Sequence, residues 1–192
     1  MKRQILLCNV PVEYELEYKS VKNVNMRVTS DGTLHISASR RHTVREIEAL
    51  LKRNEQQVIK MLANYERRRE AAPEVERFSD PRDEKAACLD VIMPLCEKYY
   101  PEFACYCGQF PQIKLRRMKS CWGNCRPQTN ILTFNSFLAY VPFECAEYVV
   151  VHEFSHFVYA NHSQMFYNTV AHFIPDWRKR RAELRRYEIY LK

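Results

Sequence analysis

The chain has 192 residues, of which 46% are hydrophobic, and this composition supports a packed core and excludes an intrinsically disordered protein. Lysine and arginine outnumber aspartate and glutamate by 30 to 23, so the net charge is +7 and acidic ligands are among the partner classes to consider. No apolar run approaches the roughly 18 residues that a membrane-spanning helix needs, and we expect no membrane partner.

The amino terminus and the cysteines indicate the cellular compartment. Residues 1–8 end in an apolar stretch that resembles a signal peptide, but Asn9 interrupts it before it reaches sufficient length. We therefore predict a cytoplasmic protein whose eight cysteines are mostly free thiols. The cysteine pairs in segments 105–107 and 121–125 suggest a second metal site, but their spacings are not those of structural zinc, and a role as small buried hydrophobes is favoured.

Three short segments near the amino terminus have the residue pattern of strands. Residues 12–18 alternate between apolar and acidic side chains, which is the period of a half-buried strand. Residues 24–28 alternate likewise, and the Asp-Gly pair at 31–32, typical of a hairpin turn, precedes a further strand at 34–37. We predict a small antiparallel sheet over residues 12–38.

A helix follows this sheet. Thr43 and Glu46 have the spacing of a capping box, in which each side chain bonds the backbone N–H of the other residue. We predict one continuous helix from Thr43 to about residue 65. Residues 67–82 are charged, contain two prolines and lack apolar periodicity, so they are predicted to form a linker.

This linker divides the chain into a β-sheet and helix region, residues 1–66, and a carboxy-terminal domain, residues 83–192. In the second domain, residues 86–99 have a helical pattern, and residues 112–118 and 130–134 have the pattern of strands. Helices and strands occupy separate stretches of the sequence, so the predicted fold class is α+β.

The last third of the chain is predicted to be helical. A turn at 122–124 separates the two strands, and Pro142 suits the first turn of a helix that we expect to end near Asn161. Ser163 is the expected cap of the next helix, Pro175 interrupts that helix, and a basic final helix follows.

The most informative motif is His152-Glu153-Phe154-Ser155-His156, which has the form H-E-x-x-H and is followed by His162. Positions four apart lie on one face of a helix, so His152 and His156 can bind one ion. Catalytic zinc takes three protein ligands and keeps one open position, and His162 supplies the third ligand if the chain turns back. Glu153 is then expected to act as the general base on a metal-activated water.

The surroundings of the motif support a zinc site. Residues 148–151 and 157–158 are apolar, which predicts a buried helix, where ionisable groups are costly unless they are paired or bound to a metal. Tyr159 stands where the metzincin pattern has a glycine, so the site is of another type, with Asn161 as the expected turning point.

The motif predicts a zinc-dependent hydrolase. We expect the strand at 130–134 to offer an edge to which an extended substrate adds. Trp122 and Asn135 would lie near the cleft, or else serve in core packing and as a turn cap. Tyr159 and Tyr167 are both candidates for stabilising the oxyanion.

Two other functions stay open, a DNA-associated protease recruited through basic patches and a non-catalytic zinc-binding protein. No nucleic-acid motif accompanies the basic residues, so solvated helix faces are favoured over nucleic-acid contacts. A purely structural zinc site gains nothing from Glu153 beside an open position. The predicted partner is therefore a peptide or protein substrate. The basic patches lie at residues 67–69, 116–117, 178–181 and 185–186.

Several segments resemble the YgjP-like zinc metallopeptidase family, which is related to the WLM- and SprT-type metalloproteases. The resemblance covers nearly the whole chain and is most specific in its second half. It implies a zincin-like catalytic domain with a small mixed or antiparallel sheet, an active-site helix, bound Zn²⁺ and peptide hydrolysis. The segments that carry it are residues 113–125, 131–135, 148–156 and 161–163, with Phe166.

Two departures from the family pattern affect what the resemblance implies. Cys121 stands where the family usually has arginine, so an anion-binding role of that arginine is not carried over. The segment between the two parts is short and charged, whereas family members often have further strands there.

Overall fold

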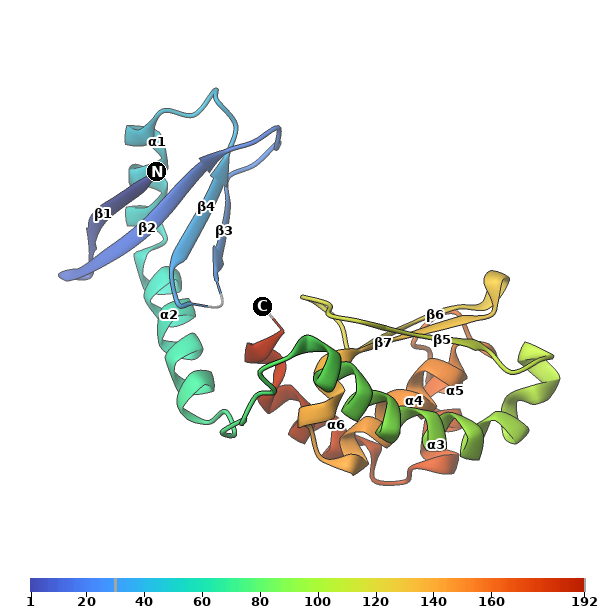
Figure 1. Ribbon diagram of the computed structural model, residues 1–192. Helices are drawn as coiled ribbons and strands as arrows, with labels where there is room; N and C mark the ends of the chain where they lie inside the picture. The colour runs from blue at the N-terminus through green and yellow to red at the C-terminus, as the bar shows by residue number, and fades with distance from the viewer. Residues whose placement is uncertain (30, 192) are drawn as a thin grey trace. The chain divides into compact units, whose positions relative to one another are not determined.

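The computed structural model describes residues 1–29 and 31–191, which form two compact units, Met1–Ala72 and Pro73–Leu191. Each unit combines helices with a small sheet, so the fold class is α+β as predicted (Figure 1). The division falls within the segment 67–82, of which residues 71–80 lie between helices. None of the described helices is both long and apolar enough to cross a membrane.

The first unit contains a four-stranded sheet in the order β1-β2-β4-β3. The predicted hairpin is confirmed, because β3 and β4 are antiparallel and Gly32 has a φ of +87° in the turn. The prediction of a purely antiparallel sheet is wrong, because β2 and β4 are parallel. β4 is buried at four of its five positions and therefore takes a central place beside β2. The strands are β1 (Lys2–Leu7), which was not predicted, β2 (Val10–Tyr18), β3 (Asn25–Val28) and β4 (Leu34–Ala38).

Two helices follow the sheet, α1 (Val44–Arg53) and α2 (Glu55–Glu70). The predicted capping box is present, with Thr43 and Glu46 each accepting from the backbone N–H of the other. The single continuous helix predicted here is wrong, because the helix breaks at Asn54. The side-chain amide of Asn54 donates to the Leu50 carbonyl at 2.9 Å and satisfies an acceptor at the end of α1.

The second unit packs a three-stranded sheet, in the order β5-β7-β6, on helices (Figure 1). β5 and β7 are parallel, and β6 and β7 are antiparallel. Residues 123–126 form strand β6, although 123 and 124 were predicted to lie in a turn. β7 is central and has partners on both sides, so the expectation that it offers a free edge is wrong. The elements are α3 (Pro81–Cys107), β5 (Gln112–Arg116), β6 (Gly123–Arg126), β7 (Ile131–Asn135), α4 (Phe143–Ser155), α5 (Gln164–Phe173) and α6 (Trp177–Arg186), with 3-10 turns at Pro127–Thr129, Ser136–Tyr140 and Glu188–Tyr190.

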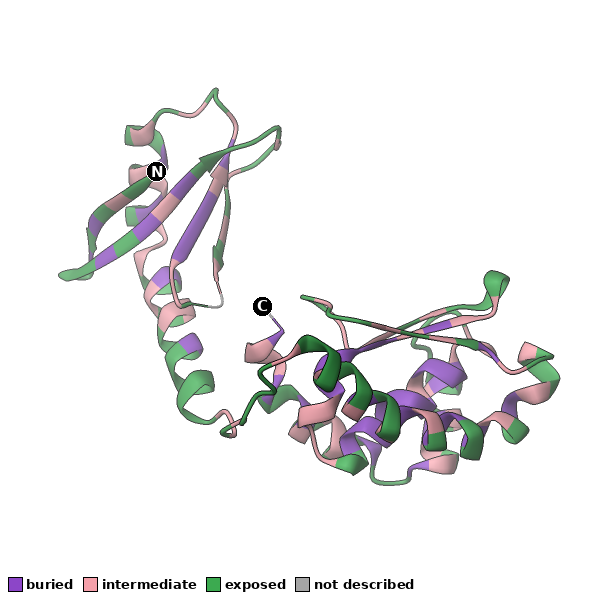
Figure 2. Cartoon of the chain, in the orientation of Figure 1, coloured by how far each residue is buried: buried purple, intermediate pink, exposed green. Residues whose placement is uncertain are grey.

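Helix α4 is the centre of this unit. Ten of its 13 residues are buried, and Figure 2 shows it almost entirely in the colour of buried residues. Its neighbours are α3, α5, α6 and strand β6. A helix that is apolar on all sides is stable only inside a core, which explains why the run of valines at 149–151 precedes the motif.

One buried carboxylate ties three of these helices together. Glu147 on α4 is 7% exposed and accepts from Lys98 Nζ at 2.7 Å, Tyr99 OH at 2.8 Å and Arg180 Nη1 at 2.6 Å. Burial raises the pKa of Glu147, but the hydrogen bonds from Lys98, Arg180 and Tyr99 outweigh burial and hold the pKa at about 2. The charged form of Glu147 therefore stabilises the folded unit.

Replacing Glu147 with glutamine is expected to lower the free energy of unfolding by about 2 kcal/mol near neutral pH, because charge-assisted hydrogen bonds are lost. The folded pKa lies below the ordinary value, so this stabilisation is complete above about pH 5 and is lost as the pH falls toward 2. Urea unfolding of both proteins near pH 7 and near pH 3 measures the difference, which should shrink in acid. Lys98→Met, which removes the most exposed partner, is the control and should cost less. An equal difference at both pH values would contradict the assignment.

Candidate metal centre

The H-E-x-x-H motif lies at the carboxy-terminal end of α4. His152 and Glu153 are in the last turn of this helix, and His156 is the first residue after it. The prediction that the helix continues to about Asn161 is wrong, because α4 ends at Ser155. Because α4 ends at Ser155, six residues, 156–161, form the turn that leads to His162.

Local hydrogen bonds explain why α4 ends so early. The backbone N–H groups of residues 156–158 donate to carbonyls three residues earlier, at 3.0–3.2 Å, so the last turn is tightened. The hydroxyl of Ser155 donates to the Val151 carbonyl at 2.7 Å, a bond that competes with the helical pattern. The chain then turns and returns to Ser163, whose side chain accepts from the Phe166 N–H and caps α5 as predicted.

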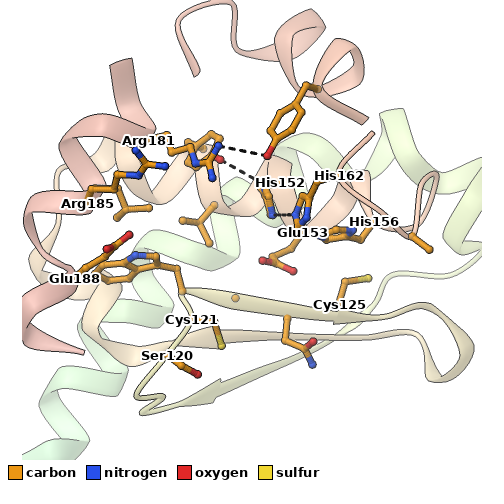
Figure 3. Close-up of a pocket in the computed structure, with 18 of the residues that line it drawn as sticks. Ser120, Cys121, Cys125, His152, Glu153, His156, His162, Arg181, Arg185 and Glu188 are labelled. Carbon is orange, nitrogen blue, oxygen red and sulfur yellow. Dashed lines mark hydrogen bonds between the residues drawn. The ribbon is translucent and has the colours of Figure 1, made fainter. Parts of the chain in front are cut away.

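The turn brings the three histidines of the prediction together. One ring nitrogen from each of His152, His156 and His162 lies within 4.8 Å of the others, and Nε2 of His152 and Nε2 of His162 are 3.0 Å apart. Figure 3 shows the three imidazoles converging beside the carboxylate of Glu153. Among the described residues, no cysteine belongs to a comparable group, and the eight cysteines are free thiols.

Neighbouring groups orient the imidazoles. Nδ1 of His156 lies 3.1 Å from the Tyr159 carbonyl, and Nδ1 of His152 lies 3.4 Å from the Tyr148 hydroxyl. Both contacts use Nδ1 and leave Nε2 for the centre of the cluster, as is usual for metal-binding histidines. Tyr148 was not predicted as part of the site, although its spacing of four residues before His152 places it on the same helix face.

Burial favours the neutral form of two of these imidazoles, those of His152 and His156. Burial, with smaller contributions from His156, His162 and Arg181, lowers the pKa of His152 to about 3. Burial also lowers the pKa of His156. A neutral imidazole is the form that binds a metal ion, so His152 and His156 do not have to lose a proton first.

Glu153 is held between the helix and the sheet. Only 4% of the residue is exposed, and burial raises the pKa of its carboxyl to about 8, although the backbone N–H of Cys125 acts in the opposite direction. A carboxyl with a raised pKa is suited to accept and return a proton near neutral pH.

Strand β6 approaches Glu153 at Gly123. A Cβ atom at position 123 would lie 2.5–2.6 Å from Oε1, Cδ and Cγ of Glu153, closer than any stable contact. Glycine at this position is therefore required for β6 and the carboxylate to occupy their places together. The segment 122–124, which was predicted to form a turn, is therefore where strand β6 contacts the H-E-x-x-H motif.

Replacing Gly123 with alanine is expected to displace the Glu153 carboxylate, because both groups are confined by strand β6 and the core. If Glu153 takes part in the reaction as the sequence predicts, a displacement of about 1 Å costs up to roughly 100-fold in rate, and the hydrolytic activity should fall to that extent. Steady-state hydrolysis of a peptide substrate measures the loss. Arg126→Ala, at an exposed position of the same strand, is the control. Full activity of the Gly123 variant would show that Glu153 has room to move.

The cluster opens into a pocket of about 710 Å³. Trp122 lines this pocket and also packs on Phe137, with ring centroids 6.2 Å apart, so both predicted roles are met. Asn135 is fully buried, caps the Phe137 N–H and donates to two carbonyls, so the turn-cap alternative is correct for it. Of the two candidate tyrosines, Tyr167 lines the pocket, whereas Tyr159 supplies only its carbonyl to His156.

The donor set fits a divalent metal ion of the zinc type. Three imidazoles converge from one side, and a set of three nitrogen ligands is the set that catalytic zinc takes. The buried carboxylate of Glu153 stands beside the cluster and has no cation to neutralise it among the described residues. A metal ion in the cluster would supply this positive charge.

Comparison with known proteins agrees with this chemistry. Residues 81–187 match the family model described as YgjP-like, metallopeptidase domain. No curated protein and no solved structure matches the sequence. The matched segment covers more than half of the chain and includes α3 to α6 with the complete histidine cluster, so the chain belongs to the YgjP-like metallopeptidase family.

Proposed function

We propose that the protein is a zinc-dependent peptidase in which His152, His156 and His162 bind Zn²⁺ and Glu153 is the general base. The observation that carries this proposal is the convergence of three imidazoles next to a buried carboxylate on the wall of an open pocket. Three nitrogen ligands are typical of catalytic zinc, whereas structural zinc sites have four protein ligands.

The residues of the chain have separate tasks in this proposal. When bound, Zn²⁺ would polarise the scissile carbonyl and lower the pKa of a coordinated water to about 7. Glu153 accepts the proton of the attacking water and transfers it to the leaving amine, so the proton is not released to solvent between the two steps. Its burial between α4 and β6 keeps bulk water from competing for that proton.

An extended substrate is expected to bind along β6. Among the strands of the described residues, β6 pairs only with β7, and its residues 123–125 line the pocket. A peptide can add to such an edge through backbone hydrogen bonds, which do not depend on its sequence. The proposed partner is therefore a peptide or an unfolded segment of a protein.

The alternative of a DNA-associated protease receives less support from the basic patches. Several of their arginines are engaged within the protein: Arg117 contacts Glu84, Arg180 contacts Glu147 and Asp176, and Arg186 contacts Glu183. Charges neutralised in this way contribute little to binding phosphates. We therefore retain peptide hydrolysis as the proposed function.

Metal analysis combined with a peptide-library digest tests the proposal. We expect about one equivalent of zinc per chain, cleavage of unstructured peptides, loss of cleavage on treatment with a chelator and recovery when zinc is added back. A circular dichroism spectrum of the chelated protein shows whether the fold survives. Cleavage that persists in a protein shown to be free of metal would contradict the proposal.

A further inference from the structure

The pocket continues from the histidine cluster to helix α6. Arg181 and Arg185, one helical turn apart on α6, line the same pocket as the three histidines and Glu153. Figure 3 shows the two arginines on one side of the pocket and the histidines on the other. A substrate in contact with the proposed metal site therefore has these two guanidinium groups within the same pocket.

These two arginines differ from others on the same helix. Arg180 is paired with Glu147 and Asp176, and Arg186 is paired with Glu183. Among residues 1–29 and 31–191, neither Arg181 nor Arg185 has a carboxylate within ion-pair distance. The acidic side chain of Glu188 also lines this part of the pocket, so its lining includes two guanidinium groups and one carboxylate.

Arg181 is positioned by aromatic residues. Its Nη1 donates to the Tyr167 hydroxyl at 3.4 Å, and its guanidinium lies 5.9 Å from the centroid of the same ring. Tyr167 in turn stacks on Trp177 with centroids 4.5 Å apart. One end of the guanidinium is thus fixed to the wall, and other N–H groups remain for a ligand, since arginine has five donors in all.

We propose that Arg181 and Arg185 bind a carboxylate of the substrate and make the protein selective for acidic peptides. This inference rests on the proposed function. Guanidinium groups match carboxylates in shape and charge, and two of them in one pocket favour an anion over a neutral amide. The carboxylate belongs either to an aspartate or glutamate side chain or to the free carboxy terminus of the substrate.

The test compares three peptides that share one sequence: a glutamate form and a glutamine form, both amidated at the carboxy terminus, and the glutamine form with a free terminus. We expect kcat/KM to be about tenfold or more higher for one or both of the acidic peptides than for the neutral peptide. The acidic peptide that is preferred identifies which carboxylate is bound. Equal kcat/KM for all three peptides would overturn the inference and leave the proposed peptidase function intact.

Three variants connect this selectivity to the two arginines. In Arg181→Gln and in Arg185→Gln, the ratio of kcat/KM between acidic and neutral peptides is expected to fall about tenfold or more. Arg185 is exposed, so its variant should fold even if Arg181→Gln is impaired. Arg186→Gln, on the same helix but outside the pocket, is the matched control and should keep the wild-type ratio. An unchanged ratio in the Arg185 variant would refute the inference for that residue.

A binding measurement separates this inference from the proposed function. Fluorescence anisotropy of the labelled peptides is measured with metal-free protein that carries Glu153→Gln, so that no turnover is needed. Tighter binding of the acidic peptide, lost in Arg185→Gln, supports the inference even if no peptide is ever cleaved. If the arginine substitutions instead weaken binding of a DNA duplex and leave peptide binding unchanged, the pocket binds phosphates and the inference is overturned.

Discussion

Glu153→Gln is expected to lower kcat by about 10²- to 10⁴-fold, the range that a general base contributes, while the bound zinc remains. Glutamine has the size of glutamate but cannot accept the proton of the attacking water. The substitution also suits the site, because Glu153 is 4% exposed and an uncharged amide is less costly to bury there. Hydrolysis of a preferred peptide, with zinc measured on the same sample, gives both quantities.

Glu144→Gln is the control for this substitution. Glu144 lies in the first turn of the same helix and is exposed, so its loss should leave kcat unchanged. A Glu153 variant with wild-type turnover would show that another group accepts the proton. A variant that has lost its zinc would show instead that the carboxylate holds the metal.

Removing His162, the proposed third ligand, is expected to have a comparably large effect. His162→Ala should weaken zinc binding by more than the roughly 10- to 100-fold that follows loss of an outer-shell partner, because the proposal makes His162 a direct ligand. His162 is exposed and lies outside α4, so the fold should persist and the melting temperature of the metal-free protein should change little. Dialysis against a zinc buffer followed by metal analysis measures the affinity.

His172→Ala serves as the matched control for His162. His172 is an exposed histidine of α5 and is not part of the cluster. Its variant should retain zinc as the wild type does. Full zinc occupancy of the His162 variant under the same dialysis would mean that a different residue provides the third ligand.

The parts of the fold that sequence predicted correctly depend on local interactions. The capping box at Thr43 and Glu46 and the cap at Ser163 involve residues three apart, and the structure has both. The same holds for the closeness of His152 and His156, which follows from their spacing of four residues, although His156 is the first residue after α4. His162 reaches the other two histidines through a turn that was predicted near Asn161 but begins after Ser155.

The errors arose where distant segments decide the structure. β6 contains Gly123 and Asn124, which are turn residues by propensity, and it is a strand because β7 provides a partner. β2 pairs in parallel with β4, and no local pattern in the sequence indicates the direction in which two strands so far apart will pair. The end of helix α4 before Asn161 is a different case, because it is set locally by the Ser155 hydroxyl and a tightened turn, without the glycine or proline that usually marks an end.

The role of Arg181 and Arg185 also could not be predicted from the sequence. In the sequence they belong to a long basic stretch in which nothing distinguishes them from Arg180 and Arg186. Only the structure shows that two of these arginines pair with carboxylates on other faces while the other two line the pocket.

The ion pair between Arg180 and Glu147 affects the shape of the pocket from a position outside it. It joins α6 to α4, the two helices that carry opposite walls of the pocket, yet neither of its residues lines that pocket. Shortening one of its side chains is expected to change the spacing of the two walls, while the residues that line the pocket stay the same. We therefore expect the preference among substrates to respond to substitutions at this ion pair, although it lies outside the pocket.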